Sequence, residues 1–281
     1  MSEAPLEGRV GATAVWTGKE MIVWGGDRGG PDEFPFADGA AYDPSRGRWR
    51  RLPEAPLAPR LEHGAVWTGR EMIVWGGHTF DRLGRHQFAD GAAYDPAGNR
   101  WRALAAAPLS PRRGQSAVWT GGEMIVWGGS ALDPEEPGLG EIILAGGAAY
   151  DPAGDAWRGI GSAVEARRFH SALWTGREMI VWGGDHRVGE GRESAVGIPE
   201  PADGAAYDPI ADRWRALPRA PEAARRAASA EWTGRDLIVW GGTLFFGGRM
   251  LAYAEGGAYS PEQDSWRALP EAPLPPRDGF A

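Results

Sequence analysis

Tryptophan recurs along this chain in three regular columns, and this periodicity constrains the fold more than any other feature. All 15 tryptophans belong to a column, and equivalent positions lie 51–58 residues apart. The first column is the tryptophan of Trp-Thr-Gly: Trp16, Trp67, Trp119, Trp174 and Trp232. The second is that of Trp-Gly-Gly: Trp24, Trp75, Trp127, Trp182 and Trp240. The third follows a Tyr-Asp/Ser-Pro turn: Trp49, Trp101, Trp157, Trp214 and Trp266. Such a period predicts one array of repeated units, so we expect a single domain over residues 1–281.

Each unit predicts four antiparallel strands. In the second unit, residues 64–67 are short and apolar, residues 71–75 form a near-continuous apolar run, and residues 89–94 are rich in small side chains. Residues 100–104 supply a fourth strand, after a turn that is typical in composition. No helical period occurs along the chain. Four strands repeated radially form a β-propeller, which leaves few exposed sheet edges.

The motif order within each unit resembles the kelch repeat. Gly-Gly follows an apolar strand, Tyr-Asp-Pro comes next, and tryptophan stands six or seven residues later. The pattern is most similar to that of bacterial kelch-repeat proteins and covers essentially the whole chain, with five copies. The fifth copy departs at Leu237 and Ser260, where the others have Met and Asp. The resemblance implies an all-β propeller of five four-stranded antiparallel blades, whose first strands line a central channel.

The number of blades has two readings. Residues 271–281 repeat the pattern of residues 3–13, so the chain ends where the first strand of a sixth unit would begin. We expect a closed ring of five blades, and an incomplete six-bladed propeller is the alternative. Closure predicts that the fifth blade packs on the first, Ile238 and Trp240 against Ile22 and Trp24.

Composition narrows the class of partner and the compartment. The net charge of -8 argues against nucleic-acid binding, which needs a basic surface. The absence of cysteine excludes disulfides, thiolate nucleophiles and cysteine-ligated metals. No signal peptide or membrane-spanning run is visible, so we expect a cytoplasmic monomer without membrane contact if Met1 is the true start.

One end of the propeller varies far more than the other. The Thr-Gly turns and the Asp/Ser-Pro turns hardly differ between units, whereas the connections between second and third strands do. These connections are residues 27–36, 78–88, 130–144, 185–201 and 243–253. They share one end of the blades with the links between successive units, and we call this end the variable face. Variable loops on a rigid scaffold are common binding sites, so we expect a ligand here, with His78, His186 and Phe245 among its contacts.

Arginine recurs seven residues before the tryptophan of each Trp-Thr-Gly. These residues are Arg9, Arg60, Arg112, Arg167 and Arg225. A carboxylate precedes the third strand in four units, at Asp38, Asp90, Asp203 and Glu255, whereas the third unit has Gly146. The pattern favours structural arginine–carboxylate pairs that lock the blades together. Four of these arginines, Arg60, Arg112, Arg167 and Arg225, are also candidates for the rim of a ligand site.

A second arginine follows in three units, at Arg113, Arg168 and Arg226. Planar guanidinium groups bind carboxylates and phosphates in bidentate fashion. We therefore expect these three side chains to be solvent-accessible at the rim of the channel and to bind an anionic ligand, such as an acidic peptide or a sugar acid. The alternative is solvated surface charge without a ligand.

Groups suited to catalysis or metal binding are sparse. His63 and His170 share one strand position, where a structural role is expected, and no spacing among His78, His86 and His186 predicts a metal site. We expect no metal and no cofactor.

The leading functional hypothesis is a non-catalytic module that binds a protein segment or a glycan, including an anionic one, on the variable face. The alternative is a carbohydrate-active enzyme resembling the kelch-type sialic acid mutarotase, and a purely structural or assembly role is a third option. Galactose oxidase, another kelch-type propeller, needs a cysteine–tyrosine cofactor, so its copper-radical chemistry is excluded here by the lack of cysteine.

Overall fold

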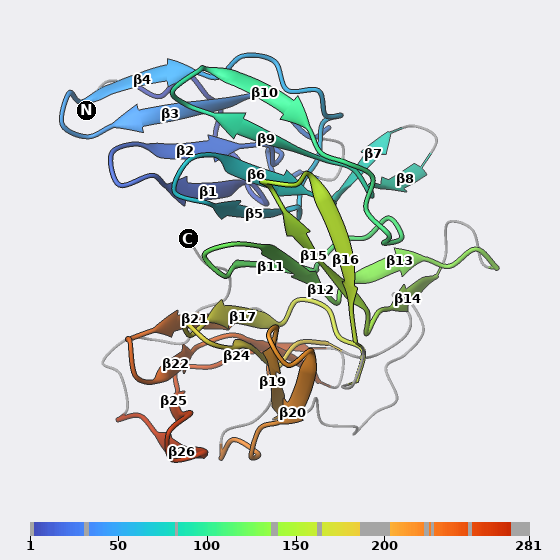
Figure 1. Cartoon of the computed structure of the whole chain (residues 1–281), viewed down its shortest axis with the longest axis vertical. Coiled ribbons are helices and arrows are strands. Elements are labelled where there is room, and N and C mark those ends of the chain that lie inside the picture. The colour runs from blue at the N-terminus through green and yellow to red at the C-terminus, as the bar shows by residue number, and fades with distance from the viewer. Residues whose placement is uncertain are drawn as a thin grey trace.

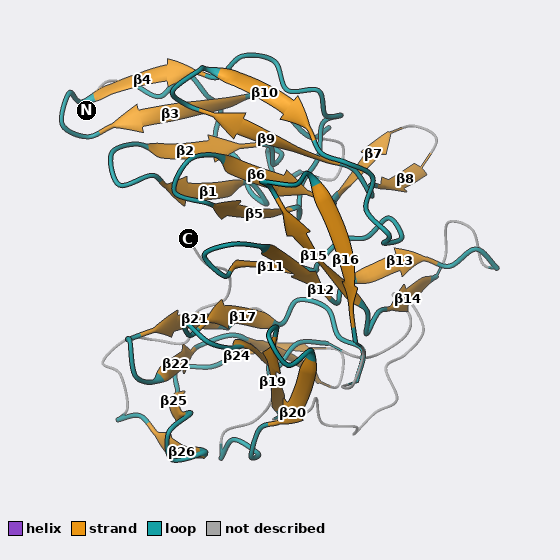
Figure 2. Cartoon of the chain, in the orientation of Figure 1, coloured by secondary structure: helices purple, strands orange, loops and turns teal. Residues whose placement is uncertain are grey.

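The computed structural model of the chain consists of β-strands and connecting loops (Figures 1 and 2). It describes residues 3–30, 34–81, 84–135, 140–161, 165–185, 203–221, 225, 228–246 and 249–270. Every regular element within these residues is a strand, and so they contain no helix long and apolar enough to cross a membrane. The expected all-β architecture is confirmed.

Five antiparallel sheets of four strands each correspond to the five sequence units, and we call them blades 1 to 5. Blade 1 contains β1 (Thr13–Trp16), β2 (Met21–Trp24), β3 (Gly39–Asp43) and β4 (Arg48–Arg51). Blade 2 contains β5 (Gly64–Trp67), β6 (Met72–Trp75), β9 (Gly91–Asp95) and β10 (Arg100–Ala103). Blade 3 contains β11 (Ser116–Trp119), β12 (Met124–Trp127), β15 (Gly147–Asp151) and β16 (Ala156–Ile160). Blade 4 contains β17 (Ser171–Trp174), β18 (Met179–Trp182), β19 (Gly204–Asp208) and β20 (Arg213–Ala216). Blade 5 contains β21 (Ser229–Trp232), β22 (Leu237–Trp240), β25 (Gly256–Ser260) and β26 (Ser265–Ala268).

The innermost strands of successive blades contact one another in chain order, from β1 to β21, around a common centre (Figure 1). The second strands are apolar on both sides because each one packs against two neighbouring blades. In blade 2, Met72 and Val74 face blade 1, whereas Ile73 and Trp75 face blade 3. Third strands begin with glycine because a Cβ on Gly91 would lie 2.5 Å from the carbonyl oxygen of Val74.

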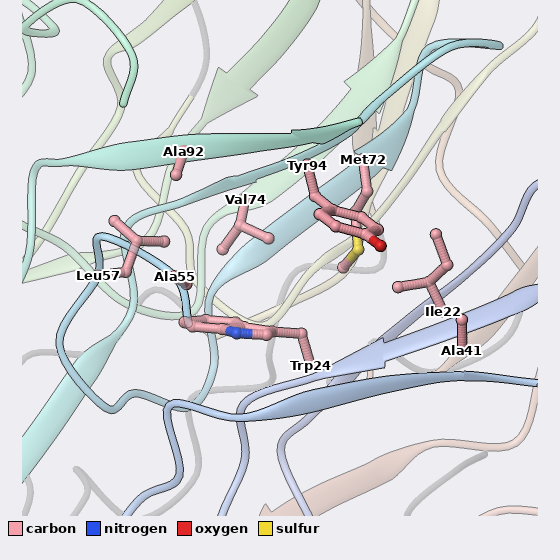
Figure 3. Close-up of a cluster of buried hydrophobic side chains, with 9 residues drawn as sticks. All are labelled: Ile22, Trp24, Ala41, Ala55, Leu57, Met72, Val74, Ala92 and Tyr94. Carbon is pink, nitrogen blue, oxygen red and sulfur yellow. The ribbon is translucent and has the colours of Figure 1, made fainter. Parts of the chain in front are cut away.

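The core lies between the blades rather than within them. Figure 3 shows the cluster between blades 1 and 2, where the indole of Trp24 lies below Val74 and beside Ala55 and Leu57. Ala55 and Leu57 belong to the link between the two blades. Trp24 and Val74 are completely buried. The proline-rich links therefore contribute to the core as well as to the connections.

A repeated polar clamp ties each blade to the next. Arg102, on the outermost strand of blade 2, donates to Glu71 of its own blade and to the hydroxyl of Tyr150 in blade 3, at 2.9 Å from the latter. That hydroxyl in turn donates to Asp155. The same clamp joins Arg50 to Tyr94, Arg158 to Tyr207 and Arg215 to Tyr259. Burial raises the pKa of Tyr150 to about 12, with a further contribution from Asp155, so the phenol stays protonated as a donor.

Tryptophans of the third column also bridge neighbouring blades. The indole nitrogen of Trp101 donates to the carbonyl oxygen of Pro53 at 3.1 Å, and its ring packs against Trp24 and Tyr94. We expect Trp101→Ala to lower the free energy of unfolding by about 3 kcal/mol, the low end for a large aromatic, because the side chain is only partly buried. Denaturant unfolding of this variant, compared with the exposed Ile210→Ala, measures the effect. Equal stability of the two variants would show that this column does not hold the blades together.

The ends of the array differ from its interior. Ile22 and Trp24 pack against blade 2, so the expected contact of these residues with Ile238 and Trp240 is wrong. Ile238 and Trp240 are partly exposed, whereas their counterparts in the other blades are buried. Among the described residues, no buried cluster joins blade 5 to blade 1. Within the residues that the structure describes, the five sheets therefore form an open array without direct closure between blades 5 and 1.

Candidate functional site

The connections between second and third strands and the links between successive blades lie at the same end of the blades, as expected. Three of the connections form two-stranded hairpins beyond the sheets: β7 (His78–Asp81) with β8 (Gly84–Gln87), β13 (Ser130–Leu132) with β14 (Glu141–Ile143), and β23 (Thr243–Phe246) with β24 (Arg249–Ala252). Isolated bridges such as Leu61 with His78 and Arg113 with Ser130 pair the preceding link with the start of the connection in blades 1 to 4. In Figure 1 the β7–β8 and β13–β14 hairpins extend side by side from one edge of the molecule. The variable face thus consists of hairpins and bridged links with regular backbone pairing.

The recurrent arginines beneath this face are structural. Arg60 is completely buried; its Nη1 donates to the carbonyl oxygen of Gly76 at 3.1 Å and to Asp90 at 2.8 Å. Its backbone hydrogen-bonds to Phe36 and Gly26 of blade 1, so the residue joins two blades. Arg9, Arg112, Arg167 and Arg225 make the equivalent glycine contacts. The pairing interpretation is confirmed, and their burial argues against a role for these guanidinium groups as a ligand rim.

Blade 3 lacks the carboxylate and keeps the backbone contacts of this arginine position. Arg112 donates to the carbonyl oxygens of Gly128 at 3.0 Å and of Gly146 at 2.9 Å. Burial lowers the pKa of Arg112 to about 10, which still leaves the guanidinium charged near neutral pH. The equivalent backbone carbonyl also contacts the arginine in the other blades, so Arg112 differs from them in lacking a carboxylate partner.

Arg113 and Arg168 are not accessible at the rim, so that expectation is wrong. Both side chains are about 5% exposed. The reason is Glu141 on β14, an equally buried carboxylate that the sequence reasoning missed. Its oxygens accept from Nε and Nη2 of Arg113 at 2.7 and 3.0 Å, and from Nη1 of Arg168. A buried guanidinium requires such a partner, and the fold supplies it internally.

A wider set of charges surrounds Glu141, which we call the Glu141 network. Its members are Glu62, Arg85, Arg113, Glu141, Arg168 and Asp185. They come from links and connections of blades 2, 3 and 4, with three positive and three negative groups, so their formal charges cancel. Burial raises the pKa of Glu141, but the hydrogen bonds and charges of the arginines outweigh it and hold that pKa below its usual value.

The network joins the two neighbouring hairpins. Arg85 on β8 donates to Glu141 on β14 at 3.1 Å. Gln87 on β8 donates to the same carboxylate and accepts from the backbone nitrogen of Leu132 on β13 at 2.7 Å. These contacts hold the β7–β8 and β13–β14 hairpins in one relative position.

The remaining candidate residues have varied placements. His78 is buried beside the network, with Nδ1 3.5 Å from Glu62. Phe245 lies in β23, where it pairs with Met250. Arg226 and His186 lie outside the described residues. Within the described part of the chain, no cluster of histidine and carboxylate side chains suits a metal ion.

His63 and His170 are structural, as expected. His63 shares a hydrogen bond of 2.7 Å with Thr13 of blade 1, and its ring lies edge-on to Trp24. His170 makes the equivalent contacts with Ser116 and Trp127 of blade 3. Desolvation by the surrounding residues, with a smaller effect of the neighbouring arginine, lowers the pKa of each imidazole to about 3.

Several exposed apolar side chains lie on the variable face, in blades 1, 3 and 5. Among the described residues, six large hydrophobic side chains are exposed, and four of them belong to the links and connections of this face: Val10, Phe34, Ile142 and Leu251. Two carboxylates of the same face, Asp90 and Glu255, remain more than half exposed although the arginines they contact are buried. Arg113 and Arg168 therefore do not form the exposed basic patch that was expected from them.

A pocket lies at the opposite end of blade 2, lined by Arg70, Glu71, Trp101 and neighbouring residues. Glu71 and Arg102 in its wall already pair in the clamp between blades. The pocket therefore lies beside that clamp and is separate from the variable face.

Comparison with known proteins agrees with this architecture. Residues 11–242 match the family model described as the KLHDC2/KLHL20/DRC7 Kelch-repeats domain. Kelch domain-containing protein 3 of Rattus norvegicus is 31% identical over 139 residues, which cover 46% of this chain and 36% of that protein. Its Homo sapiens counterpart is 30% identical over 148 residues, covering 49% and 38%. The matched segment thus spans little more than a third of these relatives. Because the family model covers most of the sequence and the five sheets carry the repeat, this chain belongs to the kelch-repeat family.

Proposed function

We propose that this chain is a non-catalytic protein-interaction module that binds a segment of a partner protein across the variable face. The observation that carries the proposal is the exposure of Ile142 and Leu251, at 42% and 43%, on hairpins that project beyond the sheets. Apolar side chains exposed on a rigid surface are typical of protein contacts. The kelch domains of the relatives support the same class of function.

The electrostatics favour a neutral or basic partner segment. Asp90 and Glu255 keep more than half of their side chains exposed, whereas Arg60 and Arg225 beneath them are buried. Arg113 and Arg168 are buried in ion pairs with Glu141, Glu62 and Asp185 and offer little attraction to an acidic ligand. Complementary charge directs association and suppresses wrong partners. We therefore propose a partner that presents apolar and basic side chains, instead of the anionic ligand expected from the sequence.

The double variant Ile142→Asp/Leu251→Asp tests the proposal. It places charge at two exposed apolar positions of the variable face, so we expect unchanged folding and at least about a tenfold loss of affinity for the partner. The partner is first isolated by affinity capture with the wild-type chain, and its binding is then measured by titration. Ile210→Asp is the matched control, because Ile210 is 93% exposed on the opposite face.

The two variants separate the outcomes. Loss of binding in the hairpin variant but not in Ile210→Asp supports the variable face. Equal binding by all three proteins, or equal loss in both variants, contradicts it.

A further inference from the structure

Both ends of the blade array have packing surfaces like those that are buried between interior blades. Trp16 of blade 1 is 53% exposed, whereas Trp67 packs partly buried against blade 1. At the other end, Trp240 of blade 5 is partly exposed, although Trp75, Trp127 and Trp182 at its position are at most 2% exposed. The two surfaces therefore carry the residues of a blade interface, but no neighbouring blade covers them among the described residues.

The innermost strands show the same difference. Between blades 2 and 3 the strands approach so closely that a Cβ on Gly64 would lie 2.8 Å from that of Ala117. The equivalent positions at the open ends are Ser229 of blade 5 and Ala14 of blade 1, and both are exposed. The open side of the array thus begins at the innermost strands and extends outward.

The polar clamp is also incomplete at both ends. Arg267 of blade 5 contacts Asp236 of its own blade at 2.8 Å and is 60% exposed. Its interior counterparts, such as Arg215, also donate to a tyrosine of the next blade. Tyr42 of blade 1 is only partly buried, whereas Tyr94 and its other counterparts are completely buried. A blade in this space would supply a tyrosine to Arg267 and an arginine to Tyr42.

Glu231 restricts which blade fits. It occupies the position of Val66, Val118 and Leu173, which pack into the interface with the following blade. The open surface of blade 1 would place Trp16 and Ala14 opposite it, and an unpaired carboxylate buried against these groups is strongly unfavourable. The same objection applies to blade 1 of a second copy. The charge of Glu231 therefore argues against direct closure and against head-to-tail self-association, and it favours a blade with a basic group on its innermost strand.

We propose that the open side, between the surface around Trp240 and Glu231 and the surface around Trp16 and Tyr42, binds one further four-stranded kelch-type sheet. A partner polypeptide presents this sheet, with a lysine or arginine on its innermost strand facing Glu231. The four interior interfaces of this chain serve as the template for both contacts. This surface is distinct from the variable face.

The first experiment tests direct closure in the full chain, which has no native cysteine. The pair Ala14→Cys/Ser229→Cys should form no intramolecular disulfide under mild oxidation. The matched pair Ser116→Cys/Ala172→Cys occupies the equivalent positions of two adjacent blades and should form one. A disulfide between positions 14 and 229 would overturn the proposal, as would head-to-tail oligomers of the wild-type chain in light scattering.

The second experiment supplies the sheet. A segment with the sequence of residues 64–103, which forms blade 2 with its connections, is attached by a flexible linker to the end of the full chain. It is made with lysine in place of the alanine equivalent to Ala65, and also without this change. We expect the lysine-bearing sheet to raise the Tm by roughly 5 °C more than the unchanged sheet, and Glu231→Gln to abolish the difference. No increase with the lysine-bearing sheet, or an increase that is independent of Glu231, would overturn the proposal.

Discussion

Glu141→Gln is expected to lower the free energy of unfolding by about 3–5 kcal/mol, because it leaves the three guanidinium groups of the buried network with only two carboxylates, Glu62 and Asp185. Arg113 and Arg168 both contact this carboxylate and are themselves about 5% exposed. A glutamine keeps the shape of the side chain, so the loss reports charge rather than a cavity. Equilibrium unfolding in urea at pH 7.5 measures it.

The matched control for this variant lies in the same connection. Glu135 is exposed, so Glu135→Gln should change stability by less than about 0.5 kcal/mol. If the two variants are equally stable, the charges around Glu141 are solvated and the network does not hold the hairpins. The same measurement would then weaken the case for a rigid variable face.

Acidification from pH 7.5 to 5 should lower the stability of the wild-type chain by about 4 kcal/mol through His63 and His170. In the folded protein, burial holds the pKa of each at about 3. In the unfolded chain each binds a proton near pH 6.5. Their neutral forms therefore contribute full stability above pH 6.5, and this contribution is lost as the pH falls toward 3, by about 2 kcal/mol each at pH 5.

The chain itself provides the control substitution. Gln115 occupies the equivalent position in blade 3 and donates to the carbonyl oxygen of Trp75 at 3.2 Å. His63→Gln/His170→Gln should accordingly fold at pH 7.5 and lose about 4 kcal/mol less than the wild type on acidification. Denaturant titrations at the two pH values provide the comparison. An unchanged pH dependence in the double variant would mean that these imidazoles are already protonated in the folded state.

The repeated elements of the fold were predictable because their residues recur. Strand boundaries follow from the Trp-Thr-Gly and Trp-Gly-Gly motifs, and the pairing of Arg60 with Asp90 follows from the regular spacing of both groups. Glu141 was not predictable in this way. It stands in a connection that differs between units, so no counterpart marks it as the partner of Arg113 and Arg168. Burial of a charge depends on such a partner, which the basic pattern alone does not contain.

The open side of the array could not be predicted from the repeat motifs either. Ile238 and Trp240 have the sequence of buried interior residues, so the motif predicts burial for them. Their exposure depends on whether a neighbouring sheet exists, which is a property of the assembled array. The one local signal was Glu231, a charge at a position where all four other blades have Val or Leu.

The clamp between blades has a direction, and this bears on how the protein unfolds. Each interior tyrosine, such as Tyr150, is held by an arginine of the preceding blade, and each arginine, such as Arg102, depends on the following blade. Stability in such an array is a sum of nearest-neighbour terms. Blades 1 and 5 each have one stabilising neighbour within the described chain, so they should open first, as local units. Backbone amides of β6, β12 and β18 should then exchange with solvent more slowly than those of β2 and β22, and folding should spread outward from the middle of the array.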